Sequence, residues 1–150
     1  MSKHTILIID DEGQVLNSLK RALRGEPYRV LTATSGWEAI GLLAHTPVAV
    51  AVCDLAMPGM DGHQLLRRIR ERHPEVVRVV LTALDDQASA VRAINENEVF
   101  RFMTKPWDDD GLRNCVLDAL ERYEAGQGRA GAGLTPAAPA ADPAGRKEIG

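Results

Sequence analysis

Acidic, hydroxyl and amino side chains stand at the ends of four separate apolar runs in this sequence of 150 residues. Asp10 and Asp11 come after the run ILII, and Asp54 comes after VAVAVC. Thr82 follows VVRVVL, and Lys105 closes VFRFMTK. Clustered carboxylates with no His or Cys beside them suit a hard divalent cation such as Mg²⁺. Together with an alcohol and an amine, they form a set suited to phosphoryl transfer onto a carboxylate.

Whether these side chains meet depends on the elements that carry them. Short apolar runs rich in β-branched residues alternate with segments of helical period, and the runs are mostly continuous in apolar character. Continuous apolar strands are typical of a parallel sheet that helices cover on both faces. We therefore expect an α/β fold with right-handed crossovers. The predicted strands are Thr5–Ile9, Tyr28–Ala33, Val48–Cys53, Val76–Leu81 and Val99–Met103.

The helices between these strands are predicted from apolar spacing and from start and stop signals. Ser35, with Glu38 three residues later, has the pattern of a capping box that opens the second helix. The fourth helix has a weaker pattern, with Ala88, Val91 and Ile94 as its inward row. We expect five helices: residues 15–23, a second from 36, Gly62–Arg72, Asp86–Asn95, and a last one from the acids at 108–110 to Tyr123.

In a parallel sheet the carboxyl ends of all strands lie at one edge, and open α/β sheets bind their ligands there. The acids, Thr82 and Lys105 all fall at that edge, whereas the opposite edge offers no acid cluster. Two like charges about 4 Å apart repel by about 4 kcal/mol at an effective dielectric constant of about 20. Asp10, Asp11 and Asp54 therefore need a cation, and Lys105 adds a further positive charge.

These residues and their neighbours resemble the receiver domains of two-component response regulators. The matching motifs are the acid pair at 10 and 11, Asp54 with MPGMDG behind it, TA at 82 and 83, and KP at 105 and 106. The resemblance covers about residues 4–124. It implies a flavodoxin-like, doubly wound sheet of five strands in the order 2-1-3-4-5, with a cis bond before Pro106.

The resemblance also implies a role for each residue of the site. Asp54 would accept a phosphoryl group from a sensor histidine kinase. Asp10 and Asp11 would hold Mg²⁺ or Mn²⁺ together with Asp54 and the backbone carbonyl of Ala56. Lys105 would contact the phosphoryl group. The chain would then be a signalling switch and not an enzyme, because it would take one phosphoryl group and lose it slowly.

The same resemblance implies how the switch would operate. Thr82 would close on the phosphoryl group, and Phe102 matches the aromatic switch position. The surface of helix four, strand five and helix five would then change and meet a downstream protein or an output domain. This surface is also a candidate for homodimer contacts. The segment FRFMTKPWDDDGLR is similar to receivers joined to cyclic-dinucleotide phosphodiesterase or kinase modules.

Other interpretations of these residues stay open at this point. Asp54 alone would cap a turn, Thr82 alone would cap helix four, and Phe102 would serve equally well as a core residue. Trp107 would cover the sheet edge or lie near the site. A metal-dependent aspartyl-phosphate hydrolase is a rival of another class, but it would want a second Asp two residues after Asp54, where the sequence has Ala56.

Composition bounds the remaining possibilities. A net charge of -3 with 45% hydrophobic and 26% charged residues is typical of a globular domain and argues against a nucleic-acid surface as the main function. The basic segment RRIRERH, residues 67–73, is expected to spread around the solvated side of its helix. Cys53 and Cys115 are expected to be small buried residues. No signal peptide or membrane span is recognisable, so a cytoplasmic location is expected.

Residues 125–150 form a separate region by composition. They are rich in Ala, Gly and Pro and have few large aliphatic residues. Such a segment buries too little apolar area to offset its chain entropy, so we expect a disordered tail or linker. The chain would then be a single-domain regulator, a receiver shortened from a longer protein, or a phosphate relay.

Overall fold

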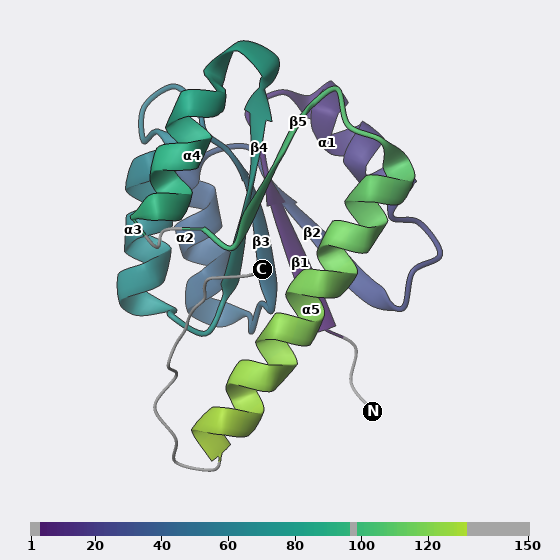
Figure 1. The fold of residues 1–150 in the computed structure, drawn as a ribbon, viewed down its shortest axis with the longest axis vertical. Coiled ribbons are helices and arrows are strands. Elements are labelled where there is room, and N and C mark those ends of the chain that lie inside the picture. The colour runs from purple at the N-terminus through teal and green to yellow at the C-terminus, as the bar shows by residue number, and fades with distance from the viewer. Residues whose placement is uncertain (1–3, 97–98, 132–150) are drawn as a thin grey trace.

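The protein has a five-stranded parallel sheet in the order β2-β1-β3-β4-β5 (Figure 1). The structure, a computed structural model, describes residues 4–96 and 99–131. The strands are β1 His4–Ile9, β2 Tyr28–Ala33, β3 Val50–Asp54, β4 Val77–Ala83 and β5 Arg101–Lys105. The helices are α1 Gly13–Ala22, α2 Gly36–His45, α3 Gly62–Arg72, α4 Gln87–Asn95 and α5 Asp109–Gly131, with a 3₁₀ turn, Leu84–Asp86, before α4. The predicted fold class and strand order are confirmed.

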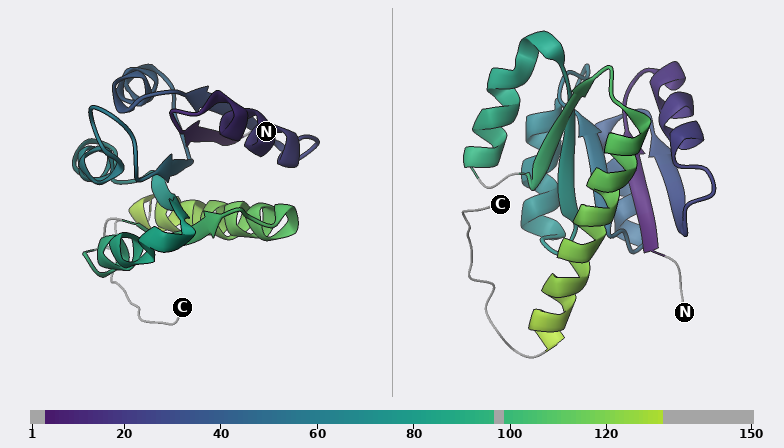
Figure 2. Two further views of the ribbon diagram at one scale, coloured as in Figure 1. Left: turned by 90° about the horizontal axis from the view of Figure 1, so that it is seen from above. Right: turned by 45° about the vertical axis from the view of Figure 1, so that its right-hand side comes forward.

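Helices cover both faces of the sheet (Figure 2). Ile6 and Ile8 of β1 pack into a core with α1 and α5, whereas Leu7 and Ile9 pack into a second core with α2, α3 and α4. All four side chains are at most 1% exposed. Because alternate residues of a strand point to opposite faces, a strand buried on both faces must be apolar throughout. This explains the continuous apolar runs of the sequence.

Three strands extend further toward the carboxyl edge than predicted. β3 ends at Asp54, β4 includes Thr82, and β5 ends at Lys105. Thr82 pairs with Thr104, and the last pair of that ladder joins Ala83 to Lys105. Backbone hydrogen bonding does not require an apolar side chain, so the ladders continue past the point where the apolar pattern stops. The polar side chains are therefore held by paired strands.

The start of α2 differs in part from the predicted capping box. Ser35 Oγ accepts a hydrogen bond from the Glu38 amide at 3.1 Å, as predicted. The Glu38 carboxylate, however, accepts from the Thr34 amide at 2.7 Å and not from Ser35. A complete capping box opens α3 instead, where Asp61 and Gln64 each accept from the other's amide. The pattern was present in the sequence but was not recognised, and such a cap is worth about 1 kcal/mol.

The predicted inward row of α4 was wrong. Ala90 and Ala93 are the buried residues of this helix. Ala88 is exposed, Val91 is 46% exposed, and only Ile94 of the predicted row packs against the core. The prediction favoured the larger side chains, but small residues let a helix lie close to the sheet and can therefore occupy its inner face.

Helix α5 runs to Gly131, seven residues past Glu124, where the predicted receiver domain ended. The prediction of disorder from residue 125 is therefore wrong for residues 125–131. The rest of that prediction falls on residues 132–150, which lie outside the described residues. Cys53 and Cys115 are buried and unpaired, as predicted. Within the described ranges, no helix is both long and apolar enough to span a membrane.

Candidate functional site

The three acids meet at the carboxyl edge of the sheet. Asp10, Asp11 and Asp54 each offer a carboxylate oxygen, and these oxygens lie within 4.8 Å of one another. Asp10 is 1% exposed and Asp54 is 6% exposed, whereas Asp11 is open to solvent. The site therefore combines two buried carboxylates with one that faces outward.

Lys105 reaches both buried acids from the end of β5. Its Nζ donates a hydrogen bond to Asp10 Oδ2 at 2.9 Å and lies 3.6 Å from Asp54 Oδ1. Burial alone would lower the pKa of this amine, but the hydrogen bond to Asp10 and the charge of Asp54 outweigh burial and raise the pKa. Lys105 therefore stays a cation beside the carboxylates.

Backbone amides fix the orientation of both buried carboxylates. Asp10 Oδ1 accepts from the Glu12 amide at 2.9 Å, and Asp54 Oδ1 accepts from the Ala56 amide at 3.4 Å. Asp54 thus caps the turn after β3 and also faces the other acids, so these two interpretations are compatible. Gly62, at the start of α3, lies against the backbone of Asp54. A Cβ on Gly62 would be 2.5 Å from the Asp54 carbonyl oxygen. This helix end therefore packs directly against the end of β3.

Thr82 does not cap helix four. Its hydroxyl donates to the Asp86 carbonyl oxygen at 3.3 Å, and the residue before α4 is Asp86. Thr82 is 1% exposed and lines a cavity of about 510 Å³. The other lining residues are Asp11, Glu12, Asp54, Ala56, Ala83, Asp85, Asp86 and Lys105. Asp85 and Asp86 were not predicted, although acids directly after β4 were a visible signal.

The two aromatic candidates lie outside this cavity. Phe102 is partly buried and packs against the core under α2, α3 and α4. Trp107 packs against the other core, under α1 and α5, and its Nε1 donates to Asp109 Oδ1 at 3.1 Å. The bond between Lys105 and Pro106 is cis, as the resemblance implied.

The electrostatics of the site fit a divalent cation. Burial, and next the charge of Asp10, raise the pKa of Asp54 to about 6, although Lys105 opposes this shift. One ammonium group is therefore too little positive charge for three carboxylates. The candidate ligands are carboxylate oxygens, which are hard ligands. Burial raises the pKa of the neighbouring Cys53 thiol, so this thiol stays protonated and adds no thiolate ligand. Such a ligand set suits Mg²⁺.

A doubly wound parallel sheet that holds acids, an alcohol and an ammonium group at its carboxyl edge is suited to phosphoryl transfer. The model of the response regulator receiver domain matches residues 6–117. The chain belongs to this family, whose members are phosphorylation-controlled switches.

Characterised relatives share this domain. The chain is 40% identical over 117 residues to the hydrogenase transcriptional regulatory protein HoxA of Cupriavidus necator, a match that covers 78% of the chain and 24% of HoxA. It is 33% identical over 124 residues to the DNA-binding transcriptional regulator NtrC of Salmonella typhimurium, covering 83% of the chain and 26% of NtrC. The chain thus spans about a quarter of the length of these relatives.

Solved structures agree in fold. The signal receiver domain of an HD domain-containing protein from Pseudomonas fluorescens is 34% identical, with a TM-score of 0.78, and the match covers 83% of the chain and 99% of that domain. A structure described as adenylate cyclase from Rhodopirellula baltica is 31% identical, with a TM-score of 0.82, and the match covers 87% of the chain and 97% of that structure.

Proposed function

We propose that Asp54 accepts a phosphoryl group from the phosphohistidine of a sensor histidine kinase. A carboxylate oxygen of Asp54 attacks phosphorus, the bond from phosphorus to the histidine nitrogen breaks, and the histidine leaves as a neutral imidazole after taking a proton from water. The observation that carries this proposal is the position of Asp54, whose Oδ1 lies 3.6 Å from Lys105 Nζ and near the oxygens of Asp10 and Asp11.

The surrounding residues supply charge and orientation. Asp10, Asp11, Asp54 and the backbone carbonyl of Ala56 would hold Mg²⁺ or Mn²⁺, which when bound supplies the positive charge that the pocket lacks. Lys105 neutralises a phosphoryl oxygen from the other side. Asp10 is held by both Lys105 and the Glu12 amide, so its carboxylate is oriented before any ligand arrives.

Thr82 and Phe102 transmit the change to the surface. A phosphoryl oxygen on Asp54 is a stronger acceptor than the Asp86 carbonyl that Thr82 now contacts, so Thr82 turns toward it. The 3₁₀ turn at Leu84–Asp86 then loses this contact and shifts with α4, and Phe102 moves inward. Such a switch requires roughly 3 to 5 kcal/mol of differential interaction, a magnitude that new charge-assisted hydrogen bonds provide.

A receiver domain has two kinds of partner, the kinase that phosphorylates it and the output that it controls. Receivers of this family pair with histidine kinases and with output domains, and the relatives named above are transcriptional regulators. We propose that the α4, β5 and α5 surface meets such an output, in the same chain or a separate protein, or forms a homodimer. Nucleic acid would be contacted only through that output. A cytoplasmic location and a receiver domain of residues 4–124 remain part of the proposal.

Labelling with acetyl phosphate tests the proposal. The wild-type chain in Mg²⁺ should take up about one phosphoryl group, and Asp54→Asn or an excess of chelator should abolish the labelling. Asp118→Asn is the matched control, because Asp118 is an exposed acid paired with Arg101. Full labelling of Asp54→Asn would refute the assignment. Steady phosphate release from small esters would instead favour the hydrolase.

A further inference from the structure

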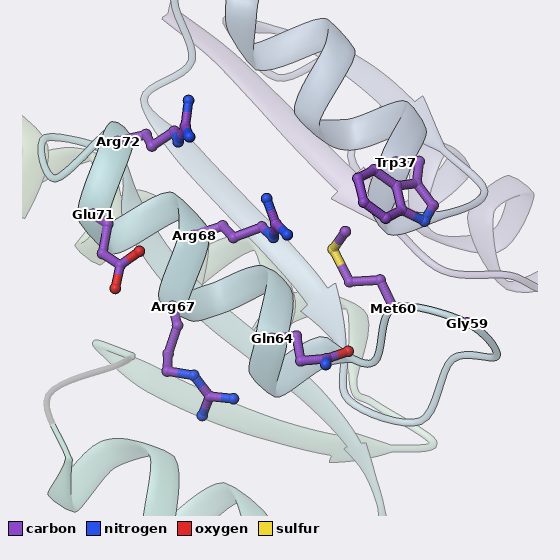
Figure 3. A pocket seen from close by; sticks show the side chains of 8 residues that line it. All are labelled: Trp37, Gly59, Met60, Gln64, Arg67, Arg68, Glu71 and Arg72. Atoms are coloured by element: carbon purple, nitrogen blue, oxygen red, sulfur yellow. The ribbon is translucent and has the colours of Figure 1, made fainter.

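A second hollow lies between α2 and α3, apart from the cavity of Asp54. This α2–α3 groove has a volume of about 600 Å³ (Figure 3). It is lined by Trp37, Gly59, Met60, Gln64, Arg67, Arg68, Glu71 and Arg72. None of these residues takes part in the proposed phosphoryl transfer. The groove also gathers much of the basic segment at 67–73, which was expected to spread around the solvated side of its helix.

Trp37 is an unusual residue on this surface. It lies in the first turn of α2 and is 63% exposed, more than any other large apolar residue described as exposed. Its neighbours Gly36 and Ala39 are buried and hold α2 against the core, so the core does not depend on the indole. Trp and Arg are the residue types most enriched at the energetic centres of protein interfaces. An exposed Trp beside several Arg therefore favours a protein partner.

Arg68 and Arg72 point toward the same side of α3. Figure 3 shows both guanidinium groups on the side of the helix that faces α2, whereas Arg67 and Glu71 project elsewhere. The Arg68 guanidinium lies 5.4 Å from the centre of the Trp37 ring. Among the described residues, neither Arg68 nor Arg72 has a carboxylate within ion-pair distance. The groove thus presents two cationic groups that form no ion pair within the part of the chain that the structure describes, although Glu71 also lines the groove.

We propose that the α2–α3 groove docks an acidic segment of a partner protein that also carries an apolar side chain. Residues four apart on a helix are separated by about 6 Å along its axis, which is close to the spacing of alternate residues in an extended chain. Carboxylates at alternate positions would thus reach Arg68 and Arg72. The apolar side chain would cover Trp37.

Two other occupants fit less well. A nucleotide or free phosphate would gain little binding free energy in the groove. The lining Arg and Gln side chains are exposed, so a small anion would stay largely hydrated there. A second copy of this chain would offer one acid run, Asp108–Asp110, in which all three residues are exposed. Those three carboxylates already contact the Gly111 amide, Trp107 Nε1 and Arg113. An acidic partner segment with an apolar side chain would pair with Arg68 and Arg72 and would also cover Trp37.

The groove borders the phosphorylation site through the connection between β3 and α3. Gly59 and Met60 form one wall and belong to the same connection as Ala56. Met60 is 6% exposed and is packed so tightly on α2 that a Cβ on Gly36 would lie 2.8 Å from its Sδ. A docked segment would therefore lie beside the site, but its binding does not depend on phosphorylation of Asp54.

Fluorescence anisotropy on the full, unphosphorylated chain tests this proposal. The probe is a labelled synthetic peptide in which Glu alternates with Ser around a central Phe, and its control has Gln in place of Glu. We expect the Glu peptide to bind, and to bind less tightly at high salt. The double variant Arg68→Glu/Arg72→Glu should weaken binding at least about tenfold. Arg24→Glu is the matched control, since Arg24 is exposed on the connection between α1 and β2.

Several results would overturn the proposal. These are equal binding of the Glu and Gln peptides, unchanged binding by the double variant, or an absence of peptide binding together with ATP binding that the double variant abolishes. Self-association that sedimentation detects and that the double variant abolishes would identify a second copy as the occupant instead. Acetyl phosphate labelling of the double variant should match wild type, so a failure of docking is distinguishable from a failure of the proposed phosphorylation.

Discussion

The amine of Lys105 hydrogen bonds to the carboxylate of Asp10 at 2.9 Å, although β3 and β4 lie between the strands that carry these residues. Lys105 ends β5 and Asp10 follows β1. Their side chains meet above the end of β3, where Asp54 lies 3.6 Å from the same amine. This contact joins the outer part of the sheet to its centre and places a cation over Asp54.

Lys105→Met should destabilise the metal-free protein by about 2 to 4 kcal/mol. The substitution leaves Asp10, which is 1% exposed, without its cationic partner. Urea denaturation in chelator measures the loss. The double variant Asp10→Asn/Lys105→Met is the control and should recover much of the lost stability, because the buried charge is then gone. An equal loss in both variants would show that packing of the lysine chain, and not charge, is responsible.

Asp54→Asn should stabilise the metal-free protein at pH 7 by about 2 to 3 kcal/mol. The pKa of Asp54 is about 6 in the folded protein, above the value of about 4 expected for an unfolded chain. The folded state therefore holds its proton more tightly, and the wild type loses stability as the pH rises from about 4 to about 6. The advantage of Asn should accordingly vanish near pH 4.

Chemical denaturation in chelator at both pH values measures this difference, and added Mg²⁺ provides the control. Mg²⁺ should stabilise the wild type more than Asp54→Asn, because ligand binding to the folded state adds to its stability. A variant no more stable than wild type at pH 7 in chelator would contradict the proposed shortage of positive charge.

Gly62→Ala should destabilise the domain by about 2 to 4 kcal/mol and impair labelling of Asp54. A Cβ at Gly62 would meet the Asp54 carbonyl oxygen and the Leu55 Cα at 2.5 Å, so the start of α3 would have to move. Gly41→Ala is the matched control within α2. A Cβ there meets nothing within 4 Å, so Gly41→Ala should stabilise by about 0.5 to 1 kcal/mol. Thermal unfolding of both variants checks the opposite signs.

Truncation should show that the folded domain extends past Glu121. A chain ending at Gly131 should melt at nearly the wild-type temperature. A chain ending at Glu121 should lose about 1 kcal/mol, because Tyr123 packs on the core and edge-on against His4, whose Nε2 lies 2.8 Å from Glu124. Most of this loss should come from Tyr123, since the pair of His4 and Glu124 is exposed. Equal melting temperatures for the two chains would contradict the prediction.

The sequence by itself determined the architecture and the grouping of the acids. Continuous apolar runs indicated strands buried on both faces, which in turn indicated a parallel sheet. Because parallel strands all end at one edge, Asp10, Asp54, Thr82 and Lys105 had to lie at that same edge. Resemblance to a known family then added the strand order, the cis bond and the proposed roles.

Only the tertiary structure decided the features that depend on how elements pack. The inner face of α4 consists of Ala90 and Ala93, because small residues allow close approach to the sheet. Trp37 and Arg68 are far apart in sequence, and they meet only because α2 and α3 lie side by side on the same face. Local periodicity carries no information on such distances or helix rotations, since these are set by the packing of the whole domain.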